Sequence, residues 1–166
     1  MKVKYPNAVI MIFCKAPIIG QVKTRLISQL TAEQAAEVHI KLAERTLQLV
    51  TLNQLCAVQL WCTPSIDHPF FKACALTYPI SLLQQTGLDL GERMSNAFCM
   101  ALINYSCALL IGCDCPSLIQ EDLEEAFFAL HQKESCVLAP AEDGGYVLIG
   151  LNQPHPELFL NIEWGT

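Results

Sequence analysis

Residues 109–116 read Leu-Leu-Ile-Gly-Cys-Asp-Cys-Pro, an apolar run that leads directly to one carboxylate and ends at a proline. A continuous apolar run from Ala108 to Ile111, bounded by turn-forming residues, is typical of a central parallel strand covered on both faces. In open sheets of this kind, ligands bind just beyond the carboxyl ends of the strands. We therefore expect Asp114 to hold a metal ion or a ligand hydroxyl. The alternative is that it caps the helix predicted over residues 121–130.

The composition indicates one domain spanning residues 1–166, because a chain of this length can bury roughly two thirds of the surface that it exposes when unfolded. Hydrophobic residues make up 52% of the chain and charged residues only 16%, which favours a sheet buried on both faces. No apolar run approaches the roughly 18 residues needed to cross a bilayer, so we expect a cytoplasmic protein without a transmembrane segment. The net charge of −6 argues against nucleic acid as a partner, since binding it needs a basic face.

The nine cysteines lie mostly in apolar segments, and their number is odd. We interpret them as reduced core residues rather than as a disulfide framework. Cys113 and Cys115 form a C-x-C pair without a second pair or a nearby histidine in the sequence, which is not the spacing of a structural zinc site.

A basic loop, residues 14–26, follows a first buried strand predicted over residues 8–13. No acid occurs before Glu33, so the loop's cations have no neutralising neighbour in the sequence. Backbone amides, a close-approach glycine and Lys or Arg cations hold phosphates in such loops. We expect a phosphate site here, with an ordinary solvated loop as the alternative. Its candidate residues are Lys15, Gly20, Lys23, Thr24 and Arg25.

A capping box at Thr31 and Gln34 predicts a long helix that ends near residue 52, with one apolar stripe. His39 falls in this helix, and we expect it at the surface or at the boundary of the core rather than as a ligand. Further strands are predicted over residues 57–62, 80–84, 135–139 and 146–151, with a short helical piece over residues 70–76.

Arg93 lies in the first turn of another predicted helix, which ends near residue 104. The helix dipole disfavours a cation there, and a bound anion would compensate it. A salt bridge to Glu92 or Asp89 is the simpler alternative.

The turn after the fifth predicted strand contains Glu142, Asp143, Gly144 and Gly145. Asp-Gly is a strong hairpin signal, so the glycines can serve only the turn. Alternatively, the backbone of the two glycines, which carry no side chain, lies against a ligand beside Glu142 and Asp143. Alternating strands and helices imply a mostly parallel sheet, which places this turn, the basic loop and Asp114 on one rim. Cations for phosphate beside a carboxylate for a divalent metal fit a nucleotide-diphosphate site.

Four blocks carry a resemblance to a known family: residues 13–26, 90–94, 111–118 and 140–146. In this order they resemble a bacterial glycosyltransferase-like family, the radical-SAM/selenodomain-associated type, within the nucleotide-diphospho-sugar transferase superfamily. The resemblance implies a GT-A type three-layer α/β/α sandwich. It further implies that Lys23 and Arg25 face nucleotide phosphates and that Asp114 binds Mg²⁺ or Mn²⁺.

Family members usually continue beyond the Trp-Gly-Thr that ends this sequence, with another helix and an acidic segment. The resemblance therefore implies a domain that lacks its C-terminal segment. Apolar surface left exposed in this way tends to become buried, so we expect self-association.

These observations predict an enzyme, a metal-dependent glycosyltransferase that uses a nucleotide-diphospho-sugar donor. Lys23 and Asp114 are its candidate catalytic residues. The first alternative is a nucleotidyltransferase that joins a nucleoside triphosphate to a phosphorylated acceptor and releases pyrophosphate. The second is a non-catalytic module that binds nucleotides.

Overall fold

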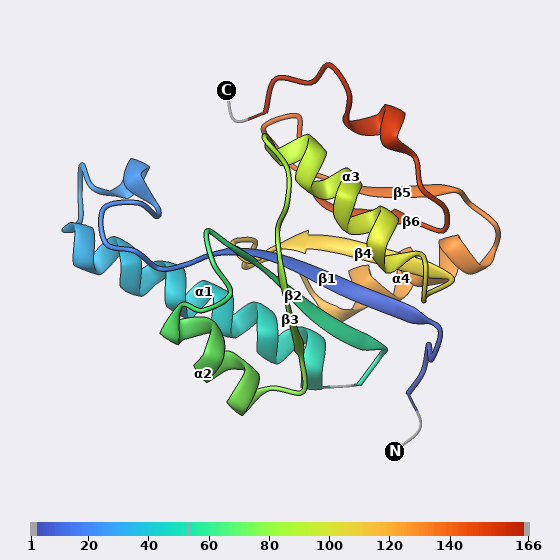
Figure 1. Ribbon diagram of the computed structural model, residues 1–166, viewed down its shortest axis with the longest axis horizontal. Helices are drawn as coiled ribbons and strands as arrows, with labels where there is room; N and C mark the ends of the chain where they lie inside the picture. The colour runs from blue at the N-terminus through green and yellow to red at the C-terminus, as the bar shows by residue number, and fades with distance from the viewer. Residues whose placement is uncertain (1–2, 53, 165–166) are drawn as a thin grey trace.

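The computed structural model describes residues 3–52 and 54–164, which form one sheet with helices on both sides (Figure 1). The sheet has six strands in the order β3-β2-β1-β4-β6-β5. The strands are β1 (Ala8–Lys15), β2 (Ala57–Thr63), β3 (Ser81–Gln84), β4 (Cys107–Gly112), β5 (Cys136–Pro140) and β6 (Tyr146–Leu151). The helices are α1 (Ala32–Leu52), α2 (Pro69–Thr77), α3 (Leu90–Ala101) and α4 (Gln120–His131), with short 3₁₀ turns η1 (Thr24–Leu26) and η2 (Pro156–Phe159).

Strands β1 to β4 run parallel, and β6 is antiparallel to both of its neighbours. Strand β5 consequently points in the same direction as β4. The carboxyl ends of β1, β4 and β5 therefore meet at one edge of the sheet. The predicted mostly parallel sheet is confirmed, and so is the common rim for the three segments that follow these strands.

The alternation of side chains along β1 explains why its whole length is apolar. Ala8, Ile10 and Ile12 belong to the core on one face of the sheet, whereas Val9 and Met11 belong to the core on the other. All five are at most 1% exposed. A strand with period-two side chains and two covered faces needs apolar residues at every position.

The two cores differ in the helices that supply them. Helices α1, α2 and α4 contribute to the first core, and α3 with the C-terminal segment contributes to the second. Figure 1 shows α1 and α2 on one side of the sheet and α3 on the other, beneath the C-terminal segment. This is the predicted three-layer α/β/α sandwich.

The start of α1 is fixed by its predicted capping box. The Thr31 hydroxyl accepts a hydrogen bond from the Gln34 amide at 3.2 Å, and the Gln34 side chain accepts one from the Thr31 amide at 2.9 Å. These reciprocal bonds satisfy two amides that a helix terminus leaves without partners.

All the cysteines are free thiols, and most are buried, as predicted. Cys115 and Cys136 are only partly buried, and Cys99 is exposed on α3, so the expectation of a core position was wrong for Cys99. Among the described residues, no helix is both long enough and apolar enough to cross a membrane.

Gly91 allows the C-terminal segment to lie close against α3. A Cβ at this position would lie 2.7 Å from the carbonyl oxygen of Phe159 and would overlap the indole of Trp164. Phe159 is buried and stacks on Phe98 with their ring centroids 6.0 Å apart. The close approach involves backbone, which cannot move aside as a flexible side chain can.

We predict that Gly91→Ala lowers the free energy of unfolding by about 1–3 kcal/mol, because overpacking outweighs the helix preference for alanine. Urea unfolding measures the change. Cys99→Ala, at an exposed position of the same helix, is the matched control and should have little effect. An unchanged Gly91→Ala midpoint would mean that the segment does not pack on α3.

Candidate functional site

A cavity of about 650 Å³ opens at the carboxyl ends of β1 and β4. Its lining combines the side chains of lysines and an arginine with one carboxylate and with apolar, phenyl and imidazole side chains. Predicted site residues in this lining are Lys15, Lys23, Thr24, Arg25 and Asp114, and the others include Phe13, His39 and Cys113. The basic loop and the turn after β4 therefore border one space.

Lys23 and Asp114 are in direct contact across this cavity. The Lys23 Nζ donates to Asp114 Oδ2 at 2.9 Å. The Lys23 side chain is 21% exposed and that of Asp114 is 59% exposed, so the carboxylate remains accessible to a ligand. An exposed pair of this kind contributes little to stability, about 0–1 kcal/mol.

The backbone at Lys23 is unusual. Its φ of 49° and ψ of 37° lie in the left-handed region, immediately before η1. A non-glycine residue in this region costs roughly 1–2 kcal/mol, and such costs concentrate at functional sites. The conformation places the ammonium at Asp114 and lets the chain turn into Thr24 and Arg25.

The capping alternative for Asp114 is wrong. Helix α4 begins at Gln120, with Ile119 as its N-cap residue. The side chain of Asp122 accepts a hydrogen bond from the Ile119 amide at 2.9 Å. Asp114 lies several residues upstream, so its carboxylate is not used by the helix.

His39 is buried, only 5% exposed, which corrects the expectation of a surface or boundary position. It falls four residues after Ala35 and four before Ala43, so it belongs to the buried stripe of α1. This i, i+4 spacing from two buried alanines is the sequence signal that could have predicted the burial of His39. Its Nε2 donates to the Lys15 carbonyl oxygen at 2.8 Å, since a carbonyl can only accept.

Burial lowers the pKa of His39, and the charges of Lys23 and Lys15 lower it further. The hydrogen bond to the Lys15 carbonyl and the charge of Asp114 act in the opposite direction. The net effect favours the neutral form of the imidazole.

The hairpin after β5 borders two adjoining cavities. One, of about 510 Å³, is lined by Arg25 together with Asp143, Gly144 and Gly145. The other, of about 280 Å³, shares Gly145 with it and shares Phe13 and Gly112 with the main cavity. These shared residues join the three spaces along one rim.

Three predicted site residues lie outside the lining of these three cavities: Gly20, Glu142 and Arg93. Gly20 does adopt a positive φ of 79°. Arg93 donates through Nε to the Gly87 carbonyl oxygen at 3.1 Å, so its contact is with the loop before α3. Among the described residues Arg93 forms no ion pair with Asp89 or Glu92, so neither ion-pair alternative holds.

Residues 46–166 match the family model described as "Uncharacterized protein conserved in bacteria (DUF2064)". The chain belongs to this family. The match begins within α1, so the basic loop of this DUF2064 protein precedes the matched region. No curated protein matches the chain.

Solved structures share the fold of this DUF2064 protein. A "putative nucleotide-diphospho-sugar transferase" from Desulfovibrio desulfuricans is 32% identical with a TM-score of 0.86, over 96% of this chain and 70% of that one. A 4-diphosphocytidyl-2C-methyl-D-erythritol synthase from Anaerococcus prevotii has 12% identity and a TM-score of 0.62, over 97% and 80% of the two chains. A cytidylyltransferase from Leptospira borgpetersenii has 14% identity and a TM-score of 0.52, over 93% and 63%. The predicted nucleotide-diphospho-sugar transferase fold is thereby confirmed.

The left-handed backbone at Lys23 leads to a stability prediction that compares two variants lacking the ammonium. Lys23→Gly should be more stable than Lys23→Ala by about 1 kcal/mol, because only glycine adopts this conformation without strain. Urea unfolding of both variants measures the difference. If the alanine variant were equally stable, the loop would not be held in the left-handed conformation.

Proposed function

We propose that this protein is a metal-dependent glycosyltransferase that uses a nucleotide-diphospho-sugar donor. The observation that carries the proposal is the contact between Lys23 and Asp114 inside a cavity that Lys15 and Arg25 also line. The sequence similarity to the Desulfovibrio desulfuricans protein supports the choice of donor.

The arrangement of charge suits a diphosphate. Lys15 is the last residue of β1, and Lys23 and Arg25 lie in the loop that follows it. All three line one opening, in a chain whose net charge is −6. Lysine offers a compact ammonium, and arginine offers a fork that matches phosphate oxygens. A bound diphosphate would attract the Lys23 ammonium away from Asp114 and leave the carboxylate free.

Asp114 fits the requirements of a hard divalent cation. Its carboxylate is accessible, follows the central strand and lies beside the proposed phosphate site. Mg²⁺ is usually held by one or two carboxylates together with substrate phosphates and water. Asp114 would be the protein ligand for Mg²⁺ or Mn²⁺, and the cation would supply Lewis-acid stabilisation of the leaving diphosphate.

The cationic side chains of the basic loop would also stabilise the leaving diphosphate. Cleavage of the bond between sugar and diphosphate increases negative charge on the departing oxygen. Lys23 and Arg25 would stabilise this charge through fixed donors that need little rearrangement during the reaction. The hairpin of Asp143, Gly144 and Gly145 borders the adjoining cavities, where the sugar would bind.

We predict that Lys23→Ala and Arg25→Ala each weaken nucleotide-diphosphate binding by about 1–3 kcal/mol, the range for a hydrogen bond to a charged group. Isothermal titration calorimetry with a panel of nucleoside diphosphates measures the loss. Lys41→Ala is the matched control, because Lys41 pairs with Glu37 on the exposed side of α1. Affinities equal to that of the unaltered chain would remove the loop from the site.

We predict that Asp114→Asn keeps the fold but loses the enhancement of nucleotide binding by Mn²⁺, since an amide has no charge to attract a hard cation. Calorimetry with and without Mn²⁺ provides the readout. Asp67→Asn serves as the control, because Asp67 forms an exposed ion pair with Lys72 elsewhere. Persistence of the Mn²⁺ effect in Asp114→Asn would exclude Asp114 as the metal ligand.

Product analysis tests the reaction type. Nucleotide-diphospho-sugars are incubated with the protein and Mn²⁺, and nucleoside diphosphate is measured. In parallel, nucleoside triphosphates are supplied with sugar phosphates, and pyrophosphate is measured. Release of nucleoside diphosphate is the expected result. Pyrophosphate alone would establish nucleotidyl transfer instead, and binding without either product would establish a non-catalytic module.

A further inference from the structure

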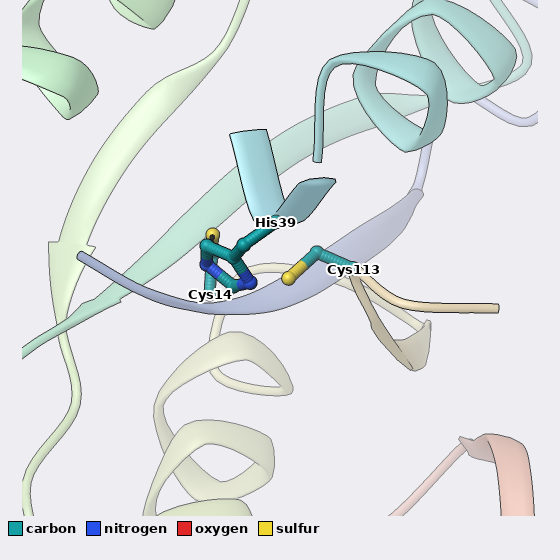
Figure 2. Close-up of side chains that lie close together, drawn as sticks. All are labelled: Cys14, His39 and Cys113. Carbon is teal, nitrogen blue, oxygen red and sulfur yellow. Dashed lines mark hydrogen bonds between the residues drawn. The ribbon is translucent and has the colours of Figure 1, made fainter. Parts of the chain in front are cut away.

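Two cysteines and one histidine meet beneath the basic loop. The ligand atoms of Cys14, His39 and Cys113 all lie within 4.8 Å of one another, and all three residues are buried. Figure 2 shows the imidazole of His39 between the two sulfur atoms. We propose that these side chains form a binding site for a thiophilic divalent cation, Zn²⁺, distinct from the proposed Mg²⁺ or Mn²⁺ ligand Asp114.

The sheet explains why the two thiols are neighbours. Phe13 of β1 pairs with Gly112, the last residue of β4. Cys14 follows Phe13 and Cys113 follows Gly112, so the two cysteines leave this pair side by side. Both cysteines belong to the core on the α1 face of the sheet. Helix α1 covers this edge with His39. Residues 99 positions apart in sequence are thereby brought to one point by register and alternation alone.

The geometry is close to that of a tetrahedral zinc centre. Bonds of about 2.3 Å from zinc to sulfur place two thiolate ligands about 3.8 Å apart. One ligand atom from each of Cys14, His39 and Cys113 lies within 4.8 Å of the other two. Small changes of side-chain torsion are sufficient to close the remaining difference.

The surroundings of His39 resemble those of a metal ligand. Its Nε2–H is held by the carbonyl oxygen of Lys15, so the neutral ring carries its lone pair on Nδ1. Metal-binding histidines commonly donate their other ring N–H to a backbone carbonyl in this way, which fixes the tautomer and the ring orientation.

Charge and access also suit zinc. Two thiolates neutralise Zn²⁺, so the occupied centre adds no net charge to the core, whereas an isolated buried charge would be costly. His39 and Cys113 line the main cavity, which gives an ion a route of entry. Three protein ligands leave a fourth position for water or another oxygen ligand, as in zinc sites with an open coordination position.

Cobalt substitution tests this site directly. The protein is first freed of metal with a chelator and kept reduced. It is then titrated with Co²⁺ in the absence of nucleotide. The expected result is a thiolate-to-cobalt charge-transfer absorption and tetrahedral visible bands that saturate at one ion per chain and disappear when Zn²⁺ is added. Absence of these bands would overturn the proposal.

Substitutions assign the ligands. Cys14→Ser and Cys113→Ser should each reduce the charge-transfer absorption by about half, because each removes one of two thiolates. The double variant should lose it. Cys107→Ser is the matched control, because Cys107 is a buried thiol at the other end of β4, and it should behave as the unaltered chain. Unchanged spectra in the double variant would refute the assignment.

Thermal melting provides a second readout that needs no absorbing metal. Zn²⁺ should raise the melting temperature of the unaltered chain and of Cys107→Ser, but not of His39→Asn or Cys113→Ser, because a ligand stabilises only a state that binds it. Circular dichroism first establishes that each variant is folded. Equal stabilisation of all variants would contradict the site. Neither assay involves transferase turnover, so failure of the proposed function and failure of this site are distinguishable.

Discussion

The parallel pairing of β1 with β4 determines where the candidate site residues of this protein lie. The pairing extends from Ala8 and Cys107 to Phe13 and Gly112, so the two chains leave the sheet at the same edge. Lys23 and Asp114 meet there at 2.9 Å although they are 91 positions apart in sequence. The same register places Cys14 beside Cys113. The rim thus brings Asp114, the proposed ligand for Mg²⁺ or Mn²⁺, next to Cys113, a proposed zinc ligand.

The central strands could be predicted from sequence because both of their faces are buried. The unbroken apolar runs of β1 and β4 leave no polar face, and in a short segment bounded by turn residues this pattern favours a buried strand. From the parallel topology it followed that the loop with Lys15 and Arg25, the residue Asp114 and the turn with Asp143 share a rim. That prediction needed only strand direction, and the structure confirms it.

Contacts between side chains could not be predicted in the same way. His39 was expected at the surface or at the boundary of the core because it is a polar residue in an amphipathic helix. Its position between Ala35 and Ala43 places it in the buried stripe, where its ring donates to the Lys15 carbonyl. The sequence spacing of Cys113 and Cys115 argued against zinc, because spacing takes account only of neighbours along the chain. The proposed zinc ligands come from β1, from the turn after β4 and from α1, and only their three-dimensional arrangement reveals them.

The central claim is that Lys23 and Asp114 act on one bound nucleotide diphosphate. A double-mutant cycle measures this, with the affinity of a nucleoside diphosphate determined in the presence of Mn²⁺ for the unaltered chain, Lys23→Ala, Asp114→Asn and the double variant. Residues that act on one ligand group show coupling energies of about 0.5–3 kcal/mol. We predict that the double variant loses less binding free energy than the sum of the two single losses. Strictly additive losses would contradict a shared site.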